Sequence, residues 1–242
     1  MSFFKTVLHT LLDLIVPPLC PICKKRVLST HGLCAECFKQ IHFIARPYCE
    51  ICGKPFEFDI PEETRCGTCC KKNPIFTKAR SAFIYDSFST KLILPFKHSD
   101  HLELTPILSN LLYQAGADFF KETDLIIGVP LHRFRYIKRK YNQADILAKA
   151  LAKKTDIPYH PHILTRQRAT VSQGHMKATE RKRNVAGAFA IKNKATIQGK
   201  TILLIDDVFT TGATINECAK ILLKNGAAKV FVLTLARVIK VS

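Results

Sequence analysis

Four closely spaced pairs of cysteines constrain the fold of this chain more than any other feature. The pairs follow the C-x-x-C pattern and are Cys20/Cys23, Cys34/Cys37, Cys49/Cys52 and Cys66/Cys69. Each C-x-x-C hairpin can present two thiolates to one metal ion, so four hairpins supply two tetrahedral four-sulfur sites. The pattern therefore predicts two structural Zn²⁺ ions in a segment too small and loop-rich to hold a core of its own.

Other uses of these cysteines remain open at this point. A disulfide framework fits poorly with a chain expected to be cytoplasmic. Iron–sulfur sites and redox dithiols are the remaining alternatives to structural zinc. Which cysteine pairs bind the same metal ion is also open. Sequential sites, in which the first two pairs share one ion and the last two share the other, need only short loops and are preferred to a cross-braced arrangement.

The charge distribution separates the cysteine-rich segment from the remainder. Residues 1–80 carry 12 basic and 7 acidic side chains, and eight thiolates with two Zn²⁺ bring that segment close to neutral, which disfavours a basic zinc finger that grips DNA. The whole chain has a formal net charge of +18, of which +11 falls in residues 131–183. Such an excess favours a phosphate-rich partner, and a solvated basic face is the alternative.

The first 18 residues predict an amphipathic helix. Apolar side chains recur at helical spacing from Phe4 to Ile15, and Pro17 and Pro18 end the pattern. A polar face with a single lysine lacks the cationic character of an interfacial helix, so we expect this helix to pack on the protein. We expect no membrane span and a cytoplasmic protein, because no apolar run is long enough and no signal-peptide cleavage site follows.

Beyond the cysteines, short apolar strands alternate with amphipathic helices. Strands are predicted at 80–85, 124–129, 201–205 and 229–236, and helices at 102–120, 142–154 and 215–224. This alternation predicts an α/β fold, a parallel sheet with helices on both faces. The predicted organisation is a helix at 1–18, a double zinc module at 19–75 and an α/β domain at 76–242.

Residues 201–214 carry the chemistry. An apolar strand leads into Asp206 and Asp207, and a turn of small residues, Thr210–Thr214, then opens a helix. The N–H groups at a helix N-terminus suit a phosphate, Gly212 permits close backbone approach, and threonine hydroxyls add donors. Two carboxylates beside a phosphate cradle make sense as acceptors for the vicinal diol of a ribose. An N-capping aspartate alone would leave the paired acids unexplained.

This string closely resembles the phosphoribosyl-pyrophosphate (PRPP) motif of the type I phosphoribosyltransferases. The resemblance narrows to the ComF family of competence-associated proteins through the cysteine pairs and the strings Arg80–Phe83, Gly128–Arg133, Tyr141–Ala144 and Arg183–Phe189. Two positions depart from the family pattern. Lys140 stands where a glycine is usual, and Pro95 alters the segment before Lys97, which leaves the role of Lys97 open.

The resemblance implies a type I phosphoribosyltransferase-like domain that binds PRPP with Mg²⁺. The implied catalytic and ribose-binding residues are Asp206 and Asp207; those for the 5-phosphate are Thr210, Thr211, Gly212, Ala213 and Thr214; those for pyrophosphate are Pro130, Leu131, His132 and Arg133. Residues 166–177 resemble the mobile loop that closes over substrate. Displacing pyrophosphate from the anomeric carbon needs positioning and charge neutralisation more than a strong base.

Three functions remain open on the sequence. The first is a phosphoribosyltransferase with an unidentified acceptor, and the second is a PRPP-binding module without turnover. The third, which the resemblance to the ComF family implies, is the handling of single-stranded DNA in competence, alone or with DNA-uptake proteins. Phe134, Tyr136 and Tyr141 lie in the basic segment and could stack on bases, although three aromatic residues in such a stretch are often core residues.

Overall fold

The computed structural model describes residues 17–29, 32–98, 101–131, 141–168 and 178–239 of the 242-residue chain. The predicted N-terminal helix, His132, Arg133, Lys140 and most of the predicted substrate loop lie outside these ranges. No helix in the described ranges has the length and apolar character needed to cross a membrane.

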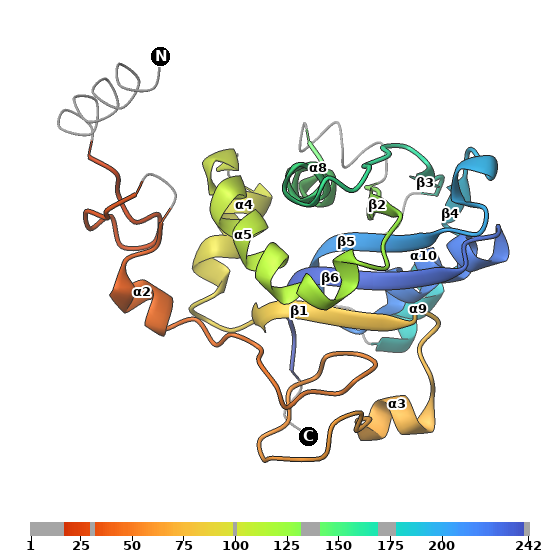
Figure 1. The fold of residues 1–242 in the computed structure, drawn as a ribbon, viewed down its shortest axis with the longest axis horizontal. Helices are drawn as coiled ribbons and strands as arrows, with labels where there is room; N and C mark the ends of the chain where they lie inside the picture. Colours follow the sequence, from red (N-terminus) through yellow and green to blue (C-terminus); the bar gives the residue numbers. More distant parts are fainter. Residues whose placement is uncertain (1–16, 30–31, 99–100, 132–140, 169–177, 240–242) are drawn as a thin grey trace.

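A parallel sheet of four strands forms the centre of the fold (Figure 1). In spatial order the strands are β1 (Lys78–Ile84), β6 (Lys229–Arg237), β5 (Thr201–Phe209) and β2 (Leu125–Gly128). Their near-continuous apolar runs are those of strands buried on both faces. The predicted parallel sheet, and the four strands assigned to it, are confirmed.

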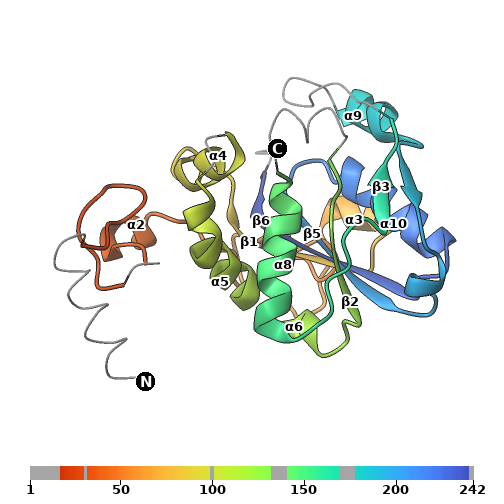
Figure 2. The same cartoon turned by 90° about the horizontal axis from the view of Figure 1, so that it is seen from above.

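One face of the sheet is covered by α4 (Thr90–His98), α5 (Thr105–Ala115), α6 (Ala117–Phe120) and α8 (Gln143–Thr155), with the 3₁₀ turn η1 (Leu102–Leu104) leading into α5 (Figure 2). Leu108 and Leu147 pack there with Leu203 and Leu233. The single helix predicted at 102–120 is instead three short segments. The break falls at Gly116, where a Cβ would lie 2.6 Å from Leu233 Cδ2, so the chain passes close to β6 at this point.

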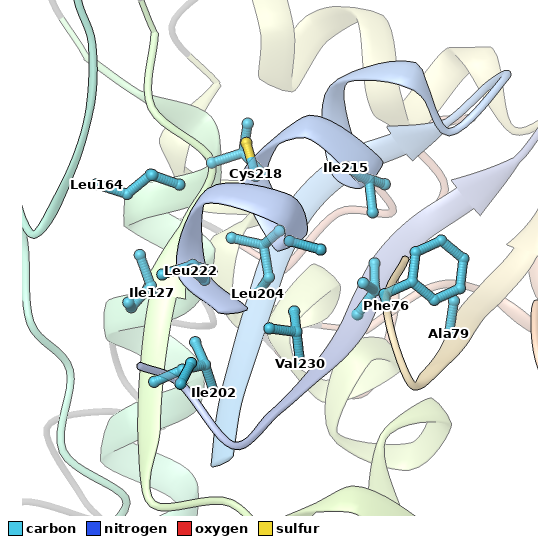
Figure 3. Close-up of a cluster of buried hydrophobic side chains, with 14 of the residues drawn as sticks. Phe76, Ala79, Ile127, Leu164, Ile202, Leu204, Ile215, Cys218, Leu222 and Val230 are labelled. Carbon is cyan, nitrogen blue, oxygen red and sulfur yellow. The ribbon is translucent and has the colours of Figure 1, made fainter. Parts of the chain in front are cut away.

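The other face carries α10 (Ala213–Lys224), the turn η2 (Ala195–Ile197), the helix α9 (Ala178–Val185) and a two-stranded antiparallel pair, β3 (Leu164–Arg166) with β4 (Phe189–Ile191). Figure 3 shows Ile215, Cys218 and Leu222 of α10 against Leu204 and Val230 of the sheet. Cys218 is fully buried and is therefore a core residue.

The cysteine-rich segment runs past the edge strand β1 and contains two short helices, α2 (Ala35–Lys39) and α3 (Gly67–Lys71). The part around α2 stands beside α4 and α5 and away from the sheet in both views (Figures 1 and 2). The part around α3 packs into the same core as α10, because its four paired cysteines belong to that buried cluster. The two halves of the segment therefore have different surroundings.

Candidate functional site

The paired cysteines form two separate clusters, and within each cluster all sulfur atoms lie within 4.8 Å of one another. The first cluster is Cys20, Cys23, Cys34 and Cys37, and the second is Cys49, Cys52, Cys66 and Cys69. Four sulfurs at about 2.3 Å from one zinc ion lie about 3.8 Å apart. The Cys23–Cys34 distance of 3.5 Å and the Cys52–Cys66 distance of 3.7 Å match this spacing. The donor sets fit one Zn²⁺ each, in the sequential grouping.

The same tight turn builds a knuckle in each cluster. In the second, the N–H of Cys49 donates to the carbonyl oxygen of Lys54 at 2.8 Å, and the N–H of Gly53 donates to that of Cys49 at 2.8 Å. The residue after the first C-x-x-C of each cluster has a left-handed backbone, with φ of +67° at Gly53 and +61° at Lys24. Glycine adopts this φ without strain. A side chain at Gly53 is also excluded by space, because a Cβ would lie 2.6 Å from the carbonyl oxygen of Ala79.

Buried ion pairs attach the second cluster to β1. Glu50, which follows the ligand Cys49, accepts hydrogen bonds from Lys78 and, at 3.1 Å, from Arg80 Nη2. Burial of Glu50 disfavours its ionised form, but Lys78 and Arg80 outweigh it and lower its pKa. The Arg80 guanidinium also lies 4.4 Å from the centre of the Tyr48 ring. Because Arg80 is buried and Glu50 is largely so, their ion pair fixes the second cluster to the sheet.

Asp206 and Asp207 lie inside β5 and not after it. The strand was predicted to end at Ile205, whereas the structure continues it to Phe209. This prediction is wrong because pairing with β6 continues beyond the two carboxylates. Neighbouring residues in a strand point to opposite faces of the sheet. The two carboxylates therefore have different neighbours.

The α4 side of the sheet supplies a cation to one of the two acids. Lys97 Nζ lies 2.8 Å from Asp207 Oδ2, and 15% of the Asp207 side chain and 29% of the Lys97 side chain remain exposed. Asp206 faces the other side, where Arg166 of β3 acts on it electrostatically. Burial and then the neighbouring Asp207 raise the pKa of Asp206 to about 8. The two acids thus differ in their surroundings: Asp207 faces the Lys97 ammonium, whereas burial favours the protonated form of Asp206.

The edge of β5 beside these acids is open. The ladder with β2 ends at the pair Gly128 and Ile205, and the N–H of Val129 makes the last bond, to the carbonyl oxygen of Ile205 at 2.9 Å. Beyond that point no described strand covers this edge. A small ligand in the plane of the sheet can therefore meet carboxylates from both faces. Ligands of open α/β sheets bind at such carboxyl ends.

The string Tyr141–Ala144 positions the groups around this edge. Asn142 Nδ2 donates to the carbonyl oxygen of Val129 at 3.0 Å, while its Oδ1 accepts the N–H of Ala144 and caps α8. Gln143 Nε2 donates to the carbonyl oxygen of Lys97 at 2.8 Å. The string thus holds both the end of β2 and the residue that pairs with Asp207. Pro95 departs from the family pattern but lies inside α4. Lys97, two residues later, still reaches Asp207.

The turn between β5 and α10 presents the N-terminus of a twelve-residue helix. Gly212 is the N-cap and has a φ of +72°, which favours glycine. Thr211 Oγ1 accepts the N–H of Ala213 at 3.4 Å, and Thr210 is exposed. The backbone N–H groups and hydroxyls of Thr210–Thr214 therefore surround a helix N-terminus beside the two carboxylates, an arrangement suited to a phosphate.

Of the residues assigned to the pyrophosphate, Pro130 and Leu131 follow directly after β2 at the open edge and are partly buried. His132 and Arg133 lie outside the described residues. Lys97, Arg166 and Gln143 were not assigned as site residues. Gln143 belongs to a string that the resemblance singles out, and Arg166 begins the segment that resembles a substrate loop. Their participation depends on contacts between distant parts of the sequence, which a single sequence does not display.

Comparison with known proteins supports each half of this description. The family model of the double zinc ribbon domain matches residues 11–70, and that of the phosphoribosyl transferase domain matches residues 142–240. Competence protein F of Haemophilus influenzae is 35% identical over 216 residues, which cover 87% of this chain and 92% of that protein. The chain belongs to the ComF family.

A second relative of this ComF-family protein is the DNA utilization protein YhgH of Salmonella typhimurium, 34% identical over 93% of this chain and 99% of its own length. Among solved structures, the orotate phosphoribosyltransferase of Aeropyrum pernix matches with 19% identity and a TM-score of 0.38, over 65% of this chain and 68% of that one. The sequence matches and the parallel sheet establish a double zinc ribbon followed by a phosphoribosyltransferase-like domain.

Proposed function

We propose that this ComF-family protein binds PRPP together with Mg²⁺ and transfers the phosphoribosyl group to an acceptor. One observation carries the proposal. Two carboxylates with different surroundings lie at the carboxyl end of β5, and the same chain segment continues directly into the glycine-capped N-terminus of α10. A sugar with a vicinal diol and a 5-phosphate presents the complementary groups in the same order.

In this proposal the ribose of PRPP lies at the open edge of β5. Ionised Asp207 accepts a hydrogen bond from one ribose hydroxyl, and Asp206 contacts the other from the opposite face. The 5-phosphate lies at Thr210–Thr214, where the positive end of the helix dipole and the threonine hydroxyls bind it. Gly212 permits the approach because it has no side chain, and its left-handed φ favours glycine.

The reaction breaks the bond between the anomeric carbon and the pyrophosphate oxygen. Pyrophosphate leaves with the electron pair, and the acceptor donates a pair to the same carbon. The protein stabilises this process by positioning the ribose and by neutralising the leaving group. Lys97 and Arg166 place positive charge around the acids, and we assign Pro130, Leu131, His132 and Arg133 to the pyrophosphate.

Mg²⁺ suits this donor set, because it binds through one or two carboxylates together with phosphate oxygens of its ligand. Asp207 is the described carboxylate that would hold it, and Asp206 would join it on losing its proton. The ion supplies charge neutralisation to the pyrophosphate. We propose the cytoplasm as the place of action, because zinc knuckles need reduced thiols and reducing compartments maintain them.

Turnover is tested by incubating the protein with PRPP, Mg²⁺ and one nitrogenous base at a time and measuring released pyrophosphate. At least one base should give release, and the double variant Asp206→Asn/Asp207→Asn should abolish it. Asp156→Asn is the matched control, since Asp156 is exposed at the end of α8. PRPP binding without release for any base would instead assign the protein to PRPP-binding modules without turnover.

Handling of single-stranded DNA is a second candidate, with or without competence DNA-uptake proteins as partners. It is supported by the net charge of +11 in residues 131–183 and by relatives named for competence and DNA utilization. Binding through phosphates should be independent of sequence and should weaken steeply with salt, by close to one unit of log K per unit of log salt for each phosphate contact. Affinity that stays constant between low and physiological salt would exclude this electrostatic mode.

A further inference from the structure

A buried arginine joins the second cysteine cluster to the end of the central sheet. Arg237 is the last residue of β6, and only 8% of it is exposed. Its Nη1 donates to the carbonyl oxygen of Cys52 at 2.7 Å, and its Nη2 donates to Cys52 Sγ at 3.3 Å. A thiolate held by zinc is a charged acceptor, so the second bond is charge-assisted when the metal is bound.

The same guanidinium lies against the residue that precedes the phosphate turn. Its carbon is 4.3 Å from the centre of the Phe209 ring, and Phe209 is the last residue of β5. The edge of that ring reaches Gly212, where a Cβ would lie 2.9 Å from Phe209 Cζ. Arg237 therefore touches both a zinc ligand and the aromatic ring that packs against Gly212.

A second contact reaches the same glycine from the end of the cysteine-rich segment. The N–H of Ile75 donates to Asn216 Oδ1 at 2.7 Å. Asn216 in turn donates twice to the carbonyl oxygen of Gly212, from its backbone N–H at 2.8 Å and from Nδ2 at 2.9 Å. Two sets of contacts thus connect the part of the chain that holds the second cluster with Gly212, the N-cap of α10. One runs through Arg237 and Phe209, and the other runs through Ile75 and Asn216.

We propose that Arg237 is a positioning residue that couples zinc in the second cluster to the phosphate turn, so that zinc and PRPP stabilise each other's binding. The PRPP half of this inference rests on the proposed function. When zinc holds Cys52, the guanidinium is fixed between the thiolate and Phe209, and the ring supports the left-handed backbone at Gly212. The first cluster stands beside α4 and α5, away from this route (Figure 2).

Coupling between two sites is reciprocal in binding free energy, so PRPP must raise the affinity of the second cluster for zinc. We expect this higher affinity to appear as slower loss of zinc. The measurement uses Cys34→Ser protein, which lacks a ligand of the first cluster, and follows zinc transfer to a chromogenic chelator with and without saturating PRPP and Mg²⁺. We expect PRPP to slow the release at least fivefold. In the same background, Arg237→Lys should reduce this effect to less than twofold while PRPP still binds. Arg46→Lys, on an exposed arginine of the same segment, is the matched control.

A purely structural arginine would lower thermal stability without changing the effect of PRPP on zinc release. Equal effects of PRPP in the Arg237 and Arg46 variants would therefore overturn the inference. If Arg237→Lys does not fold, Phe209→Leu removes the ring and keeps the arginine, and the coupling should fall in the same way.

Hydrogen exchange separates the failure of this inference from failure of the proposed function. Zinc removal from the second cluster should speed amide exchange at residues 210–216 at least tenfold, even without PRPP. If the wild-type protein does not bind PRPP but shows this acceleration, the link stands and the phosphoribosyltransferase proposal fails. Exchange at 210–216 that does not respond to zinc would overturn the link whether or not PRPP binds.

Discussion

Replacing Lys97 by methionine removes the cation that faces Asp207 and keeps most of the aliphatic length of the side chain. The two charged atoms are 2.8 Å apart, and their side chains are 29% and 15% exposed. Exposed ion pairs contribute about 0–1 kcal/mol. Removing one partner of a fully buried pair costs about 3–5 kcal/mol, because it leaves an uncompensated charge. The burial of this pair is intermediate, so Lys97→Met should lower the free energy of unfolding by about 2 kcal/mol.

The assay is urea denaturation at pH 7, with the slope used to verify that the unfolding transition is unchanged. Asp207→Asn removes the charge that Lys97 faces, so the double variant should recover at least about 1 kcal/mol relative to the sum of the single changes. Lys149→Met, at an exposed position of α8, is the control. Two results would refute the reasoning: a Lys97 variant within about 0.5 kcal/mol of wild type, or strict additivity in the double variant.

Three further predictions follow from the clusters and the acid pair. Gly53→Ala should lower the free energy of unfolding by about 1–2 kcal/mol or more, and Lys24→Gly, at the matching left-handed position of the first cluster, should raise it. The midpoint of urea denaturation of each variant, compared with that of the wild type, tests both changes. Asp206 retains its proton up to about pH 8 in the folded protein and loses it near pH 4 when unfolded, so stability should fall as pH rises between these values and Asp206→Asn should remove that slope. Metal analysis should find two Zn²⁺ per chain in the wild type and one in Cys34→Ser, whose α/β domain should melt as in the wild type.

Strands buried on both faces were the elements that the sequence predicted best. The uninterrupted apolar runs at 124–129, 201–205 and 229–236 agree with β2, β5 and β6, because burial on both faces leaves few alternatives to a parallel sheet. The strands β3 and β4 were missed, since three residues are too few to establish a period. The end of β5 was misplaced because acidic residues are rare inside strands, and only the pairing with β6 keeps them there.

The sequence predicts those parts of the candidate site whose residues are contiguous in the chain. The two acids and the glycine turn occupy one segment, and the cysteine spacing indicates its own clusters. The sequence does not identify three further residues, Lys97, Asn216 and Arg237, because each contacts a residue far away in the chain. A lone lysine, asparagine or arginine carries no local pattern that separates such a role from an ordinary surface position.

Binding of PRPP is the central claim, and calorimetric titration of the wild-type protein with PRPP and millimolar Mg²⁺ tests it most directly. The account predicts saturable binding with one site per chain. It also predicts at least a tenfold weaker affinity in Asp206→Asn/Asp207→Asn, because the hydrogen bond from a ribose hydroxyl to the charged Asp207 is alone worth about 1.5–3 kcal/mol. Zinc content should be unchanged in that variant. A wild-type protein without measurable affinity for PRPP, or a double variant that binds it equally well, would contradict the account.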